Sequence, residues 1–150
     1  MMDVTWDETS GKCYGCKEWV NGVEGVTVPI GDMLGRTIVN VTLNYENNSG
    51  ESITFKTKDE TEFVFRHRQD CCERVVIKDI TGDLHDLVDE PLLMAEEVSN
   101  QNETDDGSQT WTFYKFGNRN GYVTISWLGE SNGYYSESVD VIKLLPTDSE

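Results

Sequence analysis

Basic residues are scarce in this chain of 150 residues, because 12 Lys and Arg residues stand against 28 Asp and Glu residues. The formal net charge is −16, and after residue 79 the basic residues are Lys115, Arg119 and Lys143 alone. A negative field of this size repels DNA, RNA and anionic membrane surfaces. The composition therefore predicts no direct nucleic-acid partner and no membrane partner. It favours either simple solubility or a protein partner with a basic surface.

Long apolar runs are also missing, since no stretch approaches the roughly 20 apolar residues that a membrane span needs. The first residues, MMDVTWDETSG, lack the basic start and apolar stretch of a signal peptide. We therefore expect a cytoplasmic protein. In a reducing compartment, its four cysteines are expected to be thiols or metal ligands rather than disulfides.

Common catalytic motifs are absent as well. The sequence contains no P-loop, no G-x-G-x-x-G, no G-x-S-x-G and no H-E-x-x-H. It also has no internal repeat. No motif identifies the chain as an enzyme, and the sequence leaves open whether it catalyses a reaction.

What the sequence does contain is strand patterning. Residues 37–80 predict four antiparallel strands in a meander, and residues 110–116 and 122–128 flank the hairpin turn Gly117–Gly121. Leucines and a valine at helical spacing predict one short helix near residues 82–90, and the polar run 99–108 predicts a loop. The expected fold class is mostly β (α+β): an antiparallel meander sheet or a partly open barrel with one short helix.

The predicted domain organisation has three parts. Residues 1–32 look like an N-terminal appendage with a C-x-x-C motif, and Trp6 and Trp19 are expected to anchor it by burying apolar area. Residues 33–146 form a single β-rich domain, and residues 147–150 form a tail.

The densest group of metal-binding residue types lies in the corner between two predicted strands, at His67, Asp70, Cys71, Cys72 and Glu73. Thiolates and imidazoles suit zinc, and a C-x-x-C pair is a common half of a zinc site. One hypothesis is therefore a zinc site built from Cys13, Cys16, Cys71, Cys72 and His67. The alternative is two small buried cysteines and a core histidine, because adjacent cysteines on a strand point to opposite faces.

Two further stretches suit binding. Residues 129–137 form a glycine-framed segment with carboxylate, hydroxyl, amide and aromatic groups at Glu130, Ser131, Asn132, Tyr134 and Tyr135. Such side chains suit contact with a protein or small ligand, and the alternative is an ordinary turn with packed tyrosines.

The strand at residues 110–116 carries aromatic residues on both faces. Trp111 and Phe113 share one face, whereas Thr112, Tyr114 and Phe116 share the other. This strand is therefore either central in a two-sided core or one wall of a binding surface.

Several segments together resemble a family of small proteins from bacteriophages, prophages and their hosts that is known as a domain of unknown function. These segments are Met33–Leu43, Gln69–Glu73, Asp79–Ile80, Gly82–Leu84, Leu93–Glu97, Trp111–Phe116 and Gly129–Ser136. The resemblance covers about residues 33–145. It implies a phage setting and a site of action in the host cytoplasm, and it brings no catalytic residues.

We therefore expect a phage-encoded acidic binding protein that inhibits a host defence or nucleic-acid-handling system. It would contact a host protein with a basic surface, or sequester a nucleotide signal for which Arg66, Arg68 and Arg119 are candidate phosphate ligands. This function needs no cofactor. The alternative is a zinc-binding protein or metal-dependent enzyme that uses the Cys/His/Asp corner, and a virion component is a third hypothesis. Formation of a homo-oligomer is left open.

Overall fold

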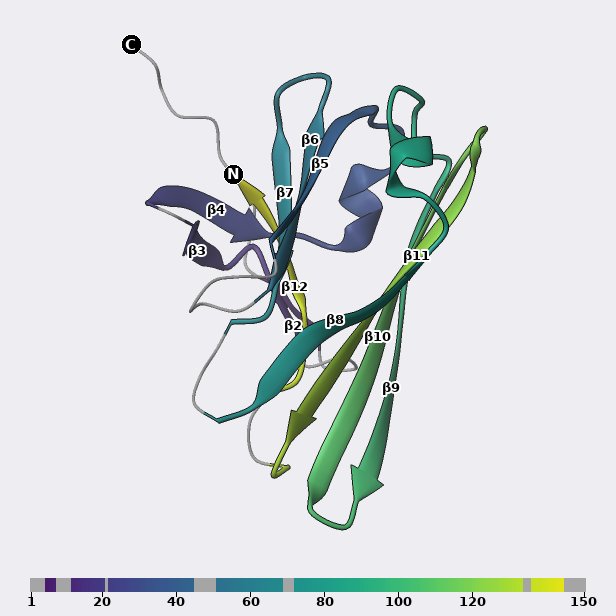
Figure 1. Ribbon diagram of the computed structural model, residues 1–150. Coiled ribbons are helices and arrows are strands. Elements are labelled where there is room, and N and C mark those ends of the chain that lie inside the picture. The colour runs from purple at the N-terminus through teal and green to yellow at the C-terminus, as the bar shows by residue number, and fades with distance from the viewer. Residues whose placement is uncertain are drawn as a thin grey trace.

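The structure, a computed structural model, consists mainly of two antiparallel sheets that pack against each other (Figure 1). It describes residues 5–7, 12–20, 22–44, 51–68, 72–133 and 136–144. Within these residues, strands predominate, neither sheet closes into a barrel, and the only helices are two 3₁₀ turns. The predicted fold class, mostly β with antiparallel pairing and very little helix, is confirmed.

The larger sheet has six strands, and its order in space is β3-β4-β12-β7-β6-β5. Their bounds are β3 Lys17–Val20, β4 Val23–Thr27, β5 Ile38–Asn44, β6 Ser52–Thr57, β7 Glu62–Arg66 and β12 Asp140–Leu144. β5, β6 and β7 form the predicted meander, in which each strand pairs with the next. β12 then lies between β7 and β4 and joins the C-terminal and N-terminal parts of the chain.

The smaller sheet has the order β8-β11-β10-β9. Its strands are long: β8 Arg74–Thr81, β9 Met94–Thr104, β10 Gly107–Asn118 and β11 Gly121–Ser131. The predicted hairpin at residues 110–128 is present as β10 and β11, which turn at residues 119–120. β8, the fourth strand of the predicted meander, leaves the first sheet and pairs with β11 instead.

The remaining elements are short. β1 (Thr5–Asp7) and β2 (Lys12–Tyr14) pair only with each other, and η1 (Ile30–Met33) and η2 (Leu84–Leu87) are single 3₁₀ turns. In the part of the chain that the structure describes, no helix is long and apolar enough to cross a membrane.

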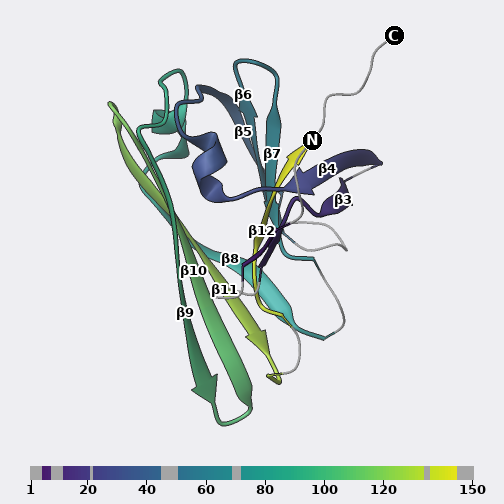
Figure 2. The same ribbon diagram turned by 180° about the vertical axis from the view of Figure 1, so that it is seen from behind.

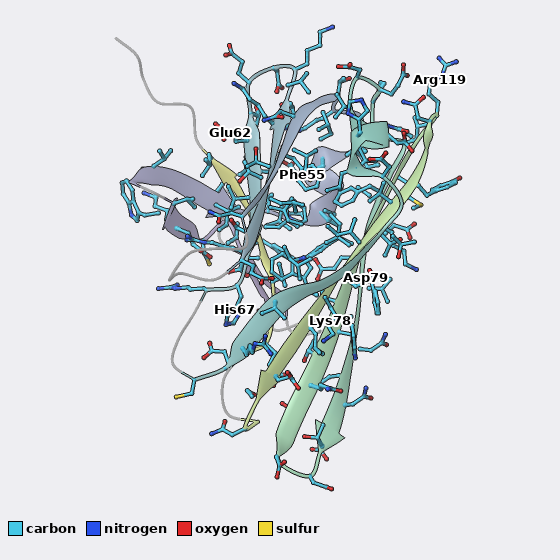
Figure 3. All side chains as sticks on the ribbon, in the orientation of Figure 1. Phe55, Glu62, His67, Lys78, Asp79 and Arg119 are labelled. Carbon is cyan, nitrogen blue, oxygen red and sulfur yellow. The ribbon has the colours of Figure 1, made fainter. Side chains whose placement is uncertain are left out.

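The core lies between the two sheets and is rich in aromatic residues. Phe55 on β6 and Phe65 on β7 meet Tyr114 and Phe116 on β10, and all four side chains are fully buried. The Phe65 and Tyr114 rings meet edge to face, with centroids 4.8 Å apart. Figure 3 shows Phe55 in the layer between the sheets. Thr112, Tyr114 and Phe116 thus belong to the core face of β10, as the alternation predicted, whereas Trp111 and Phe113 lie on its outer face.

Burial of Tyr114 in this core makes the stability of the fold depend on pH. Its hydroxyl donates a hydrogen bond to the Val139 carbonyl at 3.1 Å. Burial raises the pKa of Tyr114 well above its ordinary value of 10.0, with further contributions from the charges of Glu97 and Asp140. Because the unfolded chain can ionise this tyrosine and the folded chain cannot, its contribution to stability is present below pH 10 and is lost as the pH rises above it.

The variant Tyr114→Phe is expected to be about 1 kcal/mol less stable than the wild type at pH 7, because the Val139 carbonyl loses its donor. Above pH 10 the wild type should lose about 1.4 kcal/mol of stability per pH unit relative to the variant, because only the unfolded wild type can ionise at residue 114. The order of stability should therefore reverse by about pH 11. Urea unfolding of both proteins between pH 7 and pH 11 measures the difference. A difference that stays constant with pH would show that Tyr114 ionises in the folded protein.

Two predictions about local structure need correction. The polar run 99–108 is not a loop: it forms the end of β9, a turn at residues 105–106 and the start of β10. Backbone pairing with β10 holds residues 99–104 extended although their side chains are exposed. The predicted helix at residues 82–90 shrinks to η2, which Asp83 caps at the His85 amide and which ends because Val88 is extended and Asp89 has a positive φ of 71°.

The N-terminal residues are joined to the large sheet. β4 pairs with β12, and β3 pairs with β4, so that these two strands extend the sheet. Trp19 was expected to anchor this segment by burial, but its side chain is 62% exposed. It lies at a position of β3 that faces away from the core, while Glu18 and Val20 alternate inward. The side chain of Trp6 lies outside the described residues.

Candidate functional site

The corner between β7 and β8 holds a buried acid–base pair. His67 and Glu73 are only 7% and 4% exposed, and His67 Nε2 lies 2.8 Å from Glu73 Oε2. The other ring nitrogen, Nδ1, lies 2.6 Å from the backbone carbonyl of Ser138. His67 comes from the end of β7, Glu73 from just before β8, and Ser138 from just before β12 (Figure 3 labels His67).

This geometry fixes one of the protons on His67. A carbonyl oxygen can only accept, so Nδ1 of His67 carries a proton and donates it to Ser138. The remaining contact shares one proton between Nε2 and Glu73, either as an imidazolium with a carboxylate or as a neutral imidazole with a carboxylic acid. The pair is electrically neutral in both forms, which is how a buried pair avoids an uncompensated charge. Both ring nitrogens of His67 are occupied, so neither has a lone pair directed at a metal in this arrangement.

The expectation that the cysteines are thiols or metal ligands needs correction for Cys16 and Cys72. Cys16 and Cys72 are disulfide-bonded in the structure, whereas a reducing compartment led us to expect thiols or metal ligands. The sequence spacing of cysteines does not show which of them meet in a fold. A sulfur in a disulfide has no thiolate to offer a metal, so neither cysteine is a zinc ligand in this state.

The other members of the predicted zinc site cannot be placed. Asp70 and Cys71 lie outside the described residues, as does the side chain of Cys13. Among the side chains that are described, no group of three or more His, Cys, Asp or Glu comes together in a way that could hold a metal ion. Zinc binding by Cys13, Cys16, Cys71, Cys72 and His67 stays a prediction.

The glycine-framed segment 129–137 contains a second buried carboxylate. Glu137 is 5% exposed and accepts hydrogen bonds from three hydroxyl groups. Thr110 donates at 2.6 Å, and Ser108 and Ser131 also donate to it. Ser131 also accepts a hydrogen bond from the Gly133 amide at 3.0 Å. Glu137 therefore ties the segment after β11 to the start of β10.

The predicted binding residues separate into two groups around this carboxylate. Ser131 is engaged internally, whereas Glu130 and Asn132 are exposed. Tyr134 and Tyr135 lie outside the described residues, so their role in binding stays a prediction. The sequence analysis missed Glu137 as the centre of the segment, because its partners are up to 29 residues away and no local pattern points to them.

A shallow groove of about 640 Å³ lies on the outer face of the four-stranded sheet. Trp111 and Phe113 form its apolar part, with ring planes 6° apart and centroids separated by 6.0 Å. Its polar lining residues are Lys78, Asp79, Asn100, Asn102 and Ser126. The sequence leaves open whether this strand is central in a two-sided core or one wall of a binding surface. In the structure, Trp111 and Phe113 line the outer groove, and binding there stays a prediction.

The hairpin of β9 and β10 forms an acidic projection. Glu103, Asp105 and Asp106 at its tip are all exposed, and no Lys or Arg lies between Lys78 and Lys115 in the sequence. The tip extends beyond the six-stranded sheet in both views of the molecule (Figure 1 and Figure 2). We call residues 101–109 the acidic hairpin tip.

Comparison with known proteins identifies a family. No curated protein and no solved structure matches the chain significantly. One family model matches residues 31–141, from η1 into β12, and so covers well over half of the sequence. The matched span includes the groove, the acidic hairpin tip, His67, Glu73 and Glu137. The chain therefore belongs to the family described as Domain of unknown function (DUF7448).

Proposed function

We propose that this chain is a phage-encoded binding protein that acts in the host cytoplasm and inhibits a host defence or nucleic-acid-handling system. In this proposal, the acidic hairpin tip contacts a host protein that has a basic groove. The phage setting rests on the resemblance of the sequence motifs to phage and prophage proteins. The observation that carries the proposed contact is the exposure of Glu103, Asp105 and Asp106 at the end of a projecting hairpin.

The hairpin suits this role because its backbone is continuously paired. β9 and β10 pair without a register shift from Gly107↔Thr104 to Gly117↔Met94, and β11 supports β10 on the other side. A preorganised ribbon loses little conformational entropy when it inserts into a groove. Carboxylates placed on it would also steer a basic partner toward the tip during encounter.

The buried carboxylates support binding over catalysis. Among the described residues, Glu18, Glu73 and Glu137 are buried, and each is engaged in an internal ion pair or hydrogen bond. None of the three is presented to a substrate. The hydrogen bonds of the His67–Glu73 pair and of Glu137 join residues at or beside β7, β8, β10 and β12. These contacts give the acidic hairpin tip a stable base.

Sequestration of a nucleotide signal has weaker support, because the candidate phosphate ligands are dispersed. Arg66 already contacts Glu18 at 3.2 Å and the Trp19 carbonyl at 3.0 Å. Arg119 lies at the turn between β10 and β11, far from His67 in Figure 3, and is 3.9 Å from Glu90. We therefore favour contact with a protein.

The test is affinity capture from a bacterial host lysate with three proteins. The first is the wild type, and the second carries Glu103→Gln, Asp105→Asn and Asp106→Asn. The third carries Glu60→Gln, Asp86→Asn and Asp89→Asn, three exposed positions in the β6–β7 turn and in and after η2. These segments lie at the end of the molecule away from the acidic hairpin tip (Figure 1). Both variants lose three negative charges, so that −16 becomes −13 in each.

We expect the wild type and the control variant to retain the same host protein, and the hairpin variant to bind it roughly tenfold or more weakly. The wild-type complex should also weaken as salt is raised, because the contact is electrostatic. Equal loss in both variants would mean that only net charge matters. Equal retention in all three would remove the hairpin from the interface.

A further inference from the structure

We propose that the groove on the outer face of the four-stranded sheet is a binding site for a neutral saccharide. This site is separate from the acidic hairpin tip and goes beyond the proposed function. It rests on the side chains that line the groove, on their register across the sheet and on their charge balance.

The register places the lining residues side by side. Trp111 on β10 is opposite Asn100 on β9, and Phe113 is opposite Ser126 on β11. Ser126 is in turn opposite Asp79 on β8. The four strands therefore contribute to two adjacent rows of side chains, Asn100–Trp111 and Phe113–Ser126–Asp79, and backbone pairing fixes the spacing between them.

A β-bulge lies at the β8 end of the row that contains Phe113, Ser126 and Asp79. Ser126 pairs with Asp79 and the next residue, Trp127, pairs with Ile77, so that Lys78 is the extra residue. Bulges of this kind redirect a side chain and often lie beside functional sites. Here the bulge brings Lys78 and Asp79, both exposed, to the same groove (Figure 3).

The chemistry of the lining suits a sugar. One face of a pyranose ring consists of C–H groups, and its rim consists of hydroxyls that both donate and accept hydrogen bonds. The half-buried, parallel rings of Trp111 and Phe113 offer an apolar platform for such a face. The amides of Asn100 and Asn102 and the Ser126 hydroxyl both donate and accept, so they match hydroxyls of either role. Among the described residues, the side-chain amides of Asn100 and Asn102 have no hydrogen-bond partner.

Charge and size narrow the choice of ligand. The lining contains one cation, Lys78, and one anion, Asp79, so it has no excess charge for a phosphate or a carboxylate. The net charge of −16 also opposes nucleotides and nucleic acids. The volume of about 640 Å³ falls within the range of about 300–1,000 Å³ that is typical of small-ligand sites. A neutral oligosaccharide meets these conditions together.

The experiment measures binding of the full chain to neutral oligosaccharides of glucose, mannose, galactose and N-acetylglucosamine by isothermal titration calorimetry. We expect at least one of these sugars to bind, with an affinity that does not change between low and high salt. Trp111→Ala should weaken that binding by about tenfold. Asn100→Ala, an exposed position that leaves the core intact, should weaken it severalfold.

Trp19→Ala is the matched control, because Trp19 is an exposed tryptophan on the other sheet and its substitution should leave sugar affinity unchanged. The proposal is overturned if no sugar of the panel binds, or if Trp111→Ala and Asn100→Ala bind as tightly as the wild type. It is also overturned if the groove binds a single-stranded oligonucleotide in a salt-dependent way. A wild-type dimer that Trp111→Ala converts to a monomer, without sugar binding, would assign the face to self-association instead.

Discussion

Replacing Glu73 with alanine is expected to destabilise the protein by about 3–5 kcal/mol, because it leaves the His67 imidazole buried without its partner. The conservative variant Glu73→Gln keeps a side chain within reach of Nε2 and removes only the charge. It should lose about 1.5–3 kcal/mol. Urea unfolding at pH 7, followed by fluorescence and without reductant so that the disulfide bonding is unchanged, measures both values.

Two further variants serve as controls. One changes an exposed glutamate outside the His67–Glu73 pair, and the other replaces both members of the pair. Glu130→Ala, an exposed glutamate on the same sheet, should change the unfolding free energy by less than about 0.5 kcal/mol. The double variant His67→Phe with Glu73→Leu replaces the pair by apolar groups and should recover part of the loss, because neither member is left buried alone and only the Ser138 carbonyl loses its donor. If Glu73→Ala were as stable as Glu130→Ala, the pair would not be buried in solution.

Replacing Phe65 with alanine is the second large effect that we expect, at about 3–5 kcal/mol. Phe65 is fully buried on β7, and its ring lies 5.3 Å from that of Phe55 and 5.9 Å from that of Phe116, in addition to its edge-to-face contact with Tyr114. The substitution would open a cavity where the two sheets meet, and rigid strands on both sides cannot close it.

The matched control is Phe113→Ala, which removes the same side chain from the outer face of β10. Phe113 is only half-buried, so the loss should be about 1 kcal/mol. The contrast between the two phenylalanines, measured by thermal and urea unfolding, tests which face of the sheet is the core. Similar losses at both positions would mean that something covers the outer face.

Strand patterns on the chain predicted the local structure well. Alternation in residues 110–116 correctly separated Tyr114 and Phe116 from Trp111 and Phe113, because side chains on a strand point to opposite faces in turn. The hairpin at residues 117–121 also followed from local residue types. By contrast, β9 was missed at residues 99–104, since an exposed edge strand has no apolar alternation and is held by its backbone pairing to β10.

The candidate sites were harder to predict, because they depend on contacts between distant residues. The composition of the corner marked His67 and Glu73 as unusual, but their burial depends on Ser138, which is 71 residues away from His67. Asn100 and Asn102 gained significance only when the register placed them beside Trp111 and Gln109. The oxidation state of Cys16 and Cys72 depends on which sulfurs meet, and spacing along the chain does not determine that.

The position of β9 at the edge of its sheet has a consequence for the behaviour of the protein at high concentration. No described strand pairs with its outer side, so its backbone amides and carbonyls there are open to a strand of another molecule. Glu96 and Glu103 are exposed on this strand, and their mutual repulsion between molecules opposes such pairing. Acidification toward the isoelectric point of about 4.3 would remove that repulsion, and the protein should then precipitate through its sheet edges.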